Sequence, residues 1–249
     1  MRILVAFALS MTLSASIAKA ADKVVVDDGQ GQSFEAFVAG PEASNVGVVI
    51  VHDWFGISDF TKESVDHLGR KGVRTVAVDL YAGQAARTHE QAEALSSALD
   101  PDYAQAGVIA GLTALKAGER PVAVVGYSMG GRIALRAASE NPDLVEAVAL
   151  IYGGGFSGID DKKLALAGPI LAVTGSADEW SYGEHAGLEQ RLRNLGRHME
   201  VYVYPGADHA FAQRLYNEGK NYDQVATQAM RNVLDDFLGR HLGFAIEKD

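Results

Sequence analysis

The sequence predicts a doubly wound α/β fold, in which helices cover both faces of a mostly parallel sheet. The first observation is a series of short apolar runs of strand length. The run at 46–52 is continuous, as expected for a strand buried on both faces. The second observation is that segments with helical periodicity and helix-capping residues separate these runs. Strands that alternate with helices in this way form βαβ units, which build parallel sheets.

Each element follows from its own local pattern. Ser58 is suited to cap a helix that Gly72 ends, and Pro101 fits the first turn of another helix. The strands expected in the parallel part of the sheet are 46–52, 73–79, 121–126, 147–152, 170–175 and 199–204. The helices expected are 59–71, 89–99, 101–116, 132–139, 182–195 and 223–241. A hairpin of 24–26 and 34–38 precedes them and adds an antiparallel edge.

The N-terminus has the pattern of a secretory signal peptide. Arg2 precedes an apolar run at 3–17, and the small-x-small sequence of 18–20 places the cleavage site after Ala20. A membrane anchor is the alternative, but the run is shorter than the roughly 20 apolar residues that a spanning helix needs. We therefore expect a periplasmic or secreted protein with a single domain over residues 21–249.

Composition narrows the possible partners. Loss of Arg2 and Lys19 with the signal leaves 20 Lys and Arg against 32 Asp and Glu, a net charge of −12. This acidity argues against nucleic acids and anionic membranes, so a small molecule is the expected ligand. The lack of cysteine excludes disulfides and thiolate metal sites. No two histidines have zinc-ligand spacing on one element, and neither a phosphate-binding loop nor a dinucleotide fingerprint occurs, so we expect no metal and no cofactor. We also expect a monomer.

A candidate nucleophile lies where a predicted strand meets a predicted helix. The Gly-x-Ser-x-Gly motif at 126–130 centres on Ser128, with the third parallel strand before it and a helix after it. A nucleophile elbow requires this strand–turn–helix setting, because the flanking glycines relieve crowding at a strained turn. The helix N-terminus would then offer unpaired N–H groups to a developing oxyanion. The alternative is that Ser128 only caps the helix.

A serine hydroxyl needs a base and an orienting acid to act as a nucleophile. His209 follows the last expected strand, at the same sheet edge as Ser128, and Asp178 follows the strand before it. The resulting chain order of serine, acid and histidine is the order of this kind of site. The alternatives are a loop histidine and a helix-capping acid. The remaining helix and element-end histidines are expected to be solvated: His67, His89, His185, His198 and His241.

An oxyanion needs two backbone donors. The N–H of Met129 directly follows the candidate nucleophile. The second donor should come from the loop after the strand at 46–52, where we expect the N–H of Trp54. The Trp54 side chain could equally form a hydrophobic wall.

Four segments at the strand ends together resemble the dienelactone hydrolase family. They are 52–57 (His-Asp-Trp-Phe-Gly-Ile), 79–83 (Asp-Leu-Tyr-Ala-Gly), 126–131 (Gly-Tyr-Ser-Met-Gly-Gly) and 206–211 (Gly-Ala-Asp-His-Ala-Phe). The resemblance extends over about 24–238 and implies an α/β-hydrolase fold with a minimal cap. It also implies a catalytic triad of Ser128, Asp178 and His209.

The sequence departs from that family at the candidate site. The family's dienelactone-cleaving enzymes have a cysteine where this chain has Ser128 and a glutamate where it has Asp53. Their substrate-binding arginine corresponds to Gln213, with an arginine adjacent, and a second binding arginine has a loose match in this chain. The substrate-binding candidates are therefore Asp53, Tyr127, Arg87 and Arg214.

These observations predict a serine hydrolase that cleaves carboxylic esters of small molecules through an acyl-enzyme intermediate. A dienelactone or lactone hydrolase is the second interpretation, because the resemblance points to it. A catalytically silent binding protein on the same scaffold is the alternative from another class. The intact serine, aspartate and histidine, in the expected order, favour an enzyme.

Overall fold

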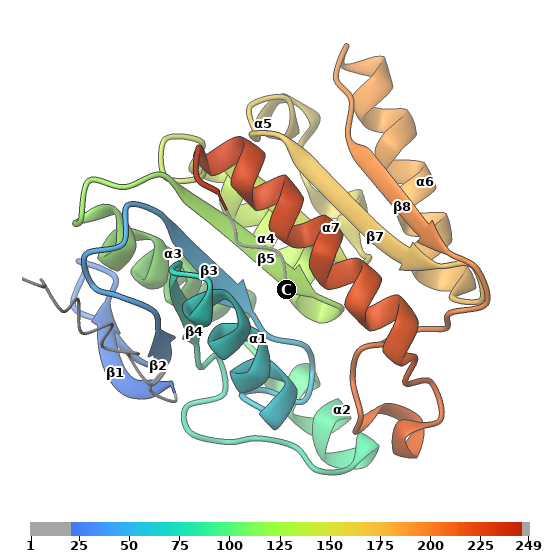
Figure 1. Cartoon of the computed structure of the whole chain (residues 1–249), viewed down its shortest axis with the longest axis horizontal. Coiled ribbons are helices and arrows are strands. Elements are labelled where there is room, and N and C mark those ends of the chain that lie inside the picture. Colours follow the sequence, from blue (N-terminus) through green and yellow to red (C-terminus); the bar gives the residue numbers. More distant parts are fainter. Residues whose placement is uncertain (1–20, 246–249) are drawn as a thin grey trace, which may run out of the picture.

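The computed structural model describes residues 21–245, so the predicted signal peptide at 1–20 lies outside the described residues. An eight-stranded sheet runs through the centre of the molecule (Figure 1). Its strands are β1 (Asp22–Asp27), β2 (Ser33–Ala39), β3 (Gly47–Val51), β4 (Arg74–Val78), β5 (Val122–Tyr127), β6 (Ala147–Ile151), β7 (Ile170–Gly175) and β8 (Glu200–Tyr204). Their order across the sheet is β1-β2-β4-β3-β5-β6-β7-β8.

The sheet is mostly parallel, as the sequence predicts. β1 pairs antiparallel with β2, and β2 pairs antiparallel with β4. All other neighbouring strands are parallel. The carboxyl ends of β3, β5, β7 and β8 therefore meet at one edge, where parallel α/β sheets place their ligand sites.

Helices cover both faces of the sheet. They are α1 (Asp59–Arg70), α2 (His89–Ala98), α3 (Pro101–Lys116), α4 (Met129–Glu140), α5 (Asp161–Leu164), α6 (Glu179–Asn194) and α7 (Gln224–Leu242), with the short 3₁₀ helices η1 (Phe156–Gly158) and η2 (Tyr216–Gly219). In Figure 1, α1 and α7 lie in front of the sheet, while α3 and α4 lie behind it. No helix within residues 21–245 is long and apolar enough to cross a membrane.

A hydrophobic core lies on each face of the sheet, and the two cores explain the continuous apolar runs in the sequence. In β3, Val49 and Val51 pack with α3 and α4, whereas Val48 and Ile50 pack with α1 and α7 on the opposite face. All five residues of this strand are buried. A strand that is buried on both faces needs an apolar side chain at every position, because successive side chains alternate between the faces.

Two helices begin earlier than the sequence predicts, and each begins directly after a candidate catalytic residue. α4 starts at Met129, because Ser128 turns the chain directly from the strand into the helix with a φ of +50°. α6 starts at Glu179, because the Asp178 carboxylate accepts the Ser181 N–H at 3.0 Å and caps the first turn.

The prediction that the helical histidines are solvated is wrong for two of them. His67 is buried between α1 and α7, with its Nε2 3.1 Å from both carboxylate oxygens of Asp235. His185 lies on the buried face of α6, where its ring stacks on Phe156 with the centroids 5.8 Å apart. Both lie on helix faces that pack against other elements.

Candidate active site

Ser128 occupies a strained turn between β5 and α4. Its φ of +50° and ψ of −116° lie outside the usual regions, a conformation that costs about 1–3 kcal/mol in a residue other than glycine. A Cβ on Gly126 would lie 2.3 Å from the Gly130 carbonyl oxygen, and one on Gly130 would lie 2.4 Å from that of Val51. The two glycines therefore allow the close packing of α4 on the sheet that holds the turn.

Ser128, His209 and Asp178 form a continuous chain of hydrogen bonds. The Ser128 Oγ lies 3.0 Å from His209 Nε2, and His209 Nδ1 lies 2.7 Å from Asp178 Oδ2. A carboxylate only accepts hydrogen bonds, so Nδ1 carries the proton and Nε2 is left to accept one from the serine. The structure thus brings together the three residues that the sequence singled out. This arrangement can remove a proton from a serine hydroxyl.

Asp178 is held as a buried anion. Its side chain is 3% exposed. Burial by itself raises the pKa of the Asp178 carboxyl, but hydrogen bonds from His209 and Ser181 outweigh it and bring the pKa below its ordinary value. Ser181 contributes both its N–H and its hydroxyl, the latter at 2.5 Å from Asp178 Oδ2. Asp178 therefore caps α6 and also binds His209, so both roles considered from the sequence apply.

Three aromatic rings surround the His209 imidazole in edge-to-face contacts. The ring centroids of Tyr216, Trp180 and Tyr152 lie 5.2, 5.4 and 5.7 Å from that of the histidine. Asn221 also donates a hydrogen bond to the His209 carbonyl at 2.9 Å. These contacts restrict rotation of the imidazole. Sequence reasoning missed the aromatic contacts, because they come from α6, from η2 and from the residue after β6, and none belongs to a motif.

A cavity of about 560 Å³ opens next to Ser128 and His209. The aromatic side chains of Trp54, Trp180 and Tyr216 contribute to its walls. Its polar lining includes Ser96, Ser97 and Arg132. The cavity can therefore hold a small molecule with both apolar and polar parts.

Two backbone N–H groups at this cavity are free to bind an oxyanion. Met129 is the first residue of α4, where an N–H has no partner within the helix. The Trp54 N–H makes no hydrogen bond within residues 21–245. The next amide, that of Phe55, is already taken by Asp53 Oδ1 at 2.8 Å. The Tyr81 hydroxyl donates to the Trp54 carbonyl at 3.3 Å and so restrains this loop on the other side of the Trp54 Cα.

The structure places none of the four substrate-binding candidates at this cavity. Asp53 and Tyr127 are 2% and 3% exposed, and both lie inside the protein. Arg87 is exposed before α2, and Arg214 forms an ion pair with Glu63 at 2.9 Å. Similarity at the motif level indicated these positions but not the direction of their side chains.

Asp53 takes part in a buried network beside Trp54, in the loop that follows β3. Its Oδ2 accepts a hydrogen bond from Gln213 Nε2 at 2.9 Å, while Oδ1 accepts the Phe55 N–H. Burial raises the pKa of the Asp53 carboxyl from 3.8 to about 6, and the two hydrogen bonds compensate for this only in part. The network holds the loop that carries Trp54.

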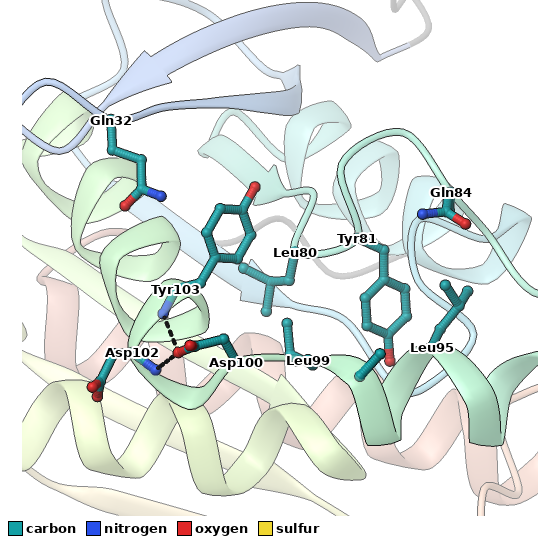
Figure 2. A pocket seen from close by; sticks show the side chains of 10 residues that line it. Gln32, Leu80, Tyr81, Gln84, Leu95, Leu99, Asp100, Asp102 and Tyr103 are labelled. Atoms are coloured by element: carbon teal, nitrogen blue, oxygen red, sulfur yellow. Dashed lines mark hydrogen bonds between the residues drawn. The ribbon is translucent and has the colours of Figure 1, made fainter.

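A second cavity, of about 600 Å³, is lined in part by Tyr81 (Figure 2). Gln32 and Tyr103 lie at one end of it, and Tyr81 and Leu95 lie at the other. The Asp100 carboxylate in its wall accepts the N–H groups of the first turn of α3 (Figure 2). The described residues that line this cavity include no serine and no histidine. The cavity at Ser128 is therefore the candidate active site.

An elbow serine that is linked through a histidine to a carboxylate, at the carboxyl edge of this sheet, defines an α/β-hydrolase. The dienelactone hydrolase family matches residues 34–242, and the chain belongs to this family. It is accordingly a hydrolase of ester or lactone bonds.

The chain is also similar to individual known proteins in sequence and in structure. "Protein usf" of Aquifex pyrophilus is 26% identical over 88% of this chain and 99% of its own length. "Carboxymethylenebutenolidase 1" of Cupriavidus pinatubonensis is 28% identical over 83% of this chain and 91% of its own. A crystal structure from Klebsiella pneumoniae, provisionally named a dienelactone hydrolase, superimposes with a TM-score of 0.73 at 20% identity. The match covers 89% of this chain and all of that one.

Proposed function

We propose that this protein is a serine hydrolase that cleaves carboxylic esters of small molecules through an acyl-enzyme intermediate. The observation that carries the proposal is the hydrogen-bond chain from Ser128 through His209 to Asp178 at the nucleophile elbow. The family assignment supports hydrolysis of ester or lactone bonds.

In this proposal each member of the chain has one task. Ser128 Oγ attacks the ester carbonyl while His209 Nε2 takes its proton. His209 then returns the proton to the leaving alkoxide, and Asp178 stabilises the imidazolium that forms in between. A water molecule, activated by the same imidazole, attacks the acyl-enzyme and releases the acid and Ser128.

The negative charge on the carbonyl oxygen falls between two amides. The Met129 and Trp54 N–H groups are the proposed oxyanion donors, since both residues line the cavity with their amides unoccupied. Tyr81 is a positioning residue in this scheme, because its bond to the Trp54 carbonyl restrains the loop that carries the Trp54 N–H.

Lactone hydrolysis is the second candidate, because similar proteins are named carboxymethylenebutenolidases. One observation weighs against the dienelactone itself. Gln213, at the position of the family's carboxylate-binding arginine, is 1% exposed and donates to Asp53 instead of facing the cavity. We therefore place open-chain esters first.

We also propose that the protein is exported and that its mature form starts at Ala21. The charged, apolar and small-residue regions of 1–20 support this proposal. N-terminal sequencing of the protein from the periplasm or medium tests it. A mature chain that still begins at Met1 in the cytoplasm would contradict it.

Turnover of a p-nitrophenyl ester by the Ser128→Ala variant tests the proposed function. We expect kcat to fall by several orders of magnitude, as it does when a nucleophile of this kind is lost. Ser157→Ala, an exposed serine in η1 outside the cavity, is the matched control and should retain wild-type kcat. Unchanged turnover in Ser128→Ala would refute the assignment, and no turnover by the wild type on a panel of esters and lactones would favour a silent binding protein.

A further inference from the structure

Arg132 brings a positive charge to the candidate active site. It is the fourth residue of α4 and lines the same cavity as Ser128. It is the only lysine or arginine among the described residues that line the cavity. A Cβ at Gly155 would lie 3.4 Å from Arg132 Cδ, so the aliphatic part of the arginine packs over a glycine that leaves room for it.

The Arg132 guanidinium has no partner among the residues that the structure describes. It makes no hydrogen bond and no ion pair with any residue in 21–245. Arg136, one turn further along α4, pairs with both Asp102 at 3.4 Å and Glu140 at 3.3 Å. An arginine that is left unpaired at a cavity is therefore available to a ligand.

The acidic groups around the cavity do not compete for this charge. Glu184 accepts the N–H groups of Gly155 and Phe156 at 2.8 and 3.2 Å. Asp178, the only carboxylate among the described lining residues, is 3% exposed and bonded to His209. An anion that enters the cavity thus meets a guanidinium and serine hydroxyls, without an exposed carboxylate in the wall.

We propose that Arg132 is a specificity residue that selects esters with a carboxylate elsewhere in the molecule. This inference rests on the proposed ester hydrolysis at Ser128. Four residues of helix span about 6 Å, so the carboxylate would lie a few bonds from the reacting carbonyl. A guanidinium binds a carboxylate through two parallel hydrogen bonds, which also fixes the orientation of the substrate. The aromatic walls formed by Trp54, Trp180 and Tyr216 cover the apolar part between the two groups.

The test compares pairs of esters that differ in one negative charge. In the first pair, mono-4-nitrophenyl glutarate carries the charge in its acyl part and 4-nitrophenyl pentanoate is neutral. In the second pair, 4-acetoxybenzoate carries the charge in its leaving group and 4-acetoxybenzamide is neutral. For each pair, kcat/KM is measured for the wild type, Arg132→Gln, Arg132→Lys and the control Arg136→Gln.

We expect the wild type to prefer the charged member of at least one pair. In Arg132→Gln that preference should fall about tenfold, which corresponds to about 1.4 kcal/mol. Arg132→Lys should retain part of it, and Arg136→Gln should retain all of it. The preference should also weaken with added salt, because the site is open to solvent.

Two other outcomes separate the two proposals. If Arg132→Gln lowers kcat/KM equally for charged and neutral esters, or changes neither, the specificity role is wrong while ester hydrolysis stands. If the wild type turns over neither member of either pair, the hydrolase proposal fails. The anion site at Arg132 still stands in that case if the wild type binds a fluorescent carboxylate that benzoate displaces, and Arg132→Gln does not bind it. If neither turnover nor such binding occurs, both proposals are overturned.

Discussion

Replacement of Asp53 by asparagine should change how the stability of the protein depends on pH. Asp53 is 2% exposed, and burial raises the pKa of its carboxyl from 3.8 to about 6. The folded protein thus binds this proton more tightly than the unfolded chain does. The stability that protonation provides is complete below about pH 4 and is lost as the pH rises through about 6.

The size of the effect follows from the two pKa values. Their difference of about 2.2 corresponds to a cost of about 3 kcal/mol for the ionised carboxyl, at about 1.36 kcal/mol for each pH unit. About 2 kcal/mol of this cost develops between pH 4.5 and 7.5. An asparagine cannot ionise, so the variant avoids it. The variant also loses the hydrogen bond from Gln213, which lowers its stability at both pH values alike.

Urea unfolding followed by far-ultraviolet circular dichroism measures this difference. We subtract the free energy of unfolding of the wild type from that of Asp53→Asn. This difference should be about 2 kcal/mol larger at pH 7.5 than at pH 4.5, because only the wild type loses stability as Asp53 ionises. Asp143→Asn, which removes an exposed carboxylate, controls for the change in net charge. The difference in the free energy of unfolding between Asp53→Asn and the wild type could instead be the same at both pH values. That result would refute the argument that ionisation of a buried Asp53 carboxyl lowers the stability of the protein.

Three further substitutions test the supports of the site. Ser181→Ala should lower kcat about tenfold at unchanged KM, because Asp178 loses a hydroxyl partner; steady-state kinetics with equal kcat would contradict this. Gly130→Ala should destabilise the fold by at least ~3 kcal/mol in urea unfolding, because its Cβ meets a backbone carbonyl at 2.4 Å. Gly183→Ala, in open space on α6, is the control and should be neutral or stabilising by up to ~1 kcal/mol. Tyr81→Phe should lower kcat about tenfold at constant stability, because the oxyanion loop loses its hydroxyl anchor; wild-type kcat would argue against that role.

Much of the fold could be predicted, because local pattern and tertiary packing agree in this chain. The helix at 101–116 has the predicted bounds, since Asp100 caps it and Pro101 fits its first turn. β7 also has its predicted bounds of 170–175, because a strand buried on both faces consists of apolar residues throughout. The order of strands across the sheet has no such local signal. It depends on contacts between residues far apart in the sequence.

The candidate site was predictable only where a motif or the chain order indicated it. Ser128, Asp178 and His209 each follow a strand, so the rule for parallel sheets places them at one edge. Trp180 and Tyr216 contact the imidazole from separate elements, and no sequence spacing connects them. Arg132 comes two residues after the elbow motif, but an arginine on a helix surface has no pattern that separates a binding role from simple solvation.

Reaction of the folded protein with a fluorophosphonate probe tests the central claim most directly. Such a probe labels a serine only when a base activates it and an oxyanion site receives the phosphoryl oxygen. Peptide mass spectrometry should find the label on Ser128, and His209→Ala or prior unfolding should abolish it. A folded wild-type protein that carries no label on Ser128, or carries it on another serine, would contradict the proposed mechanism.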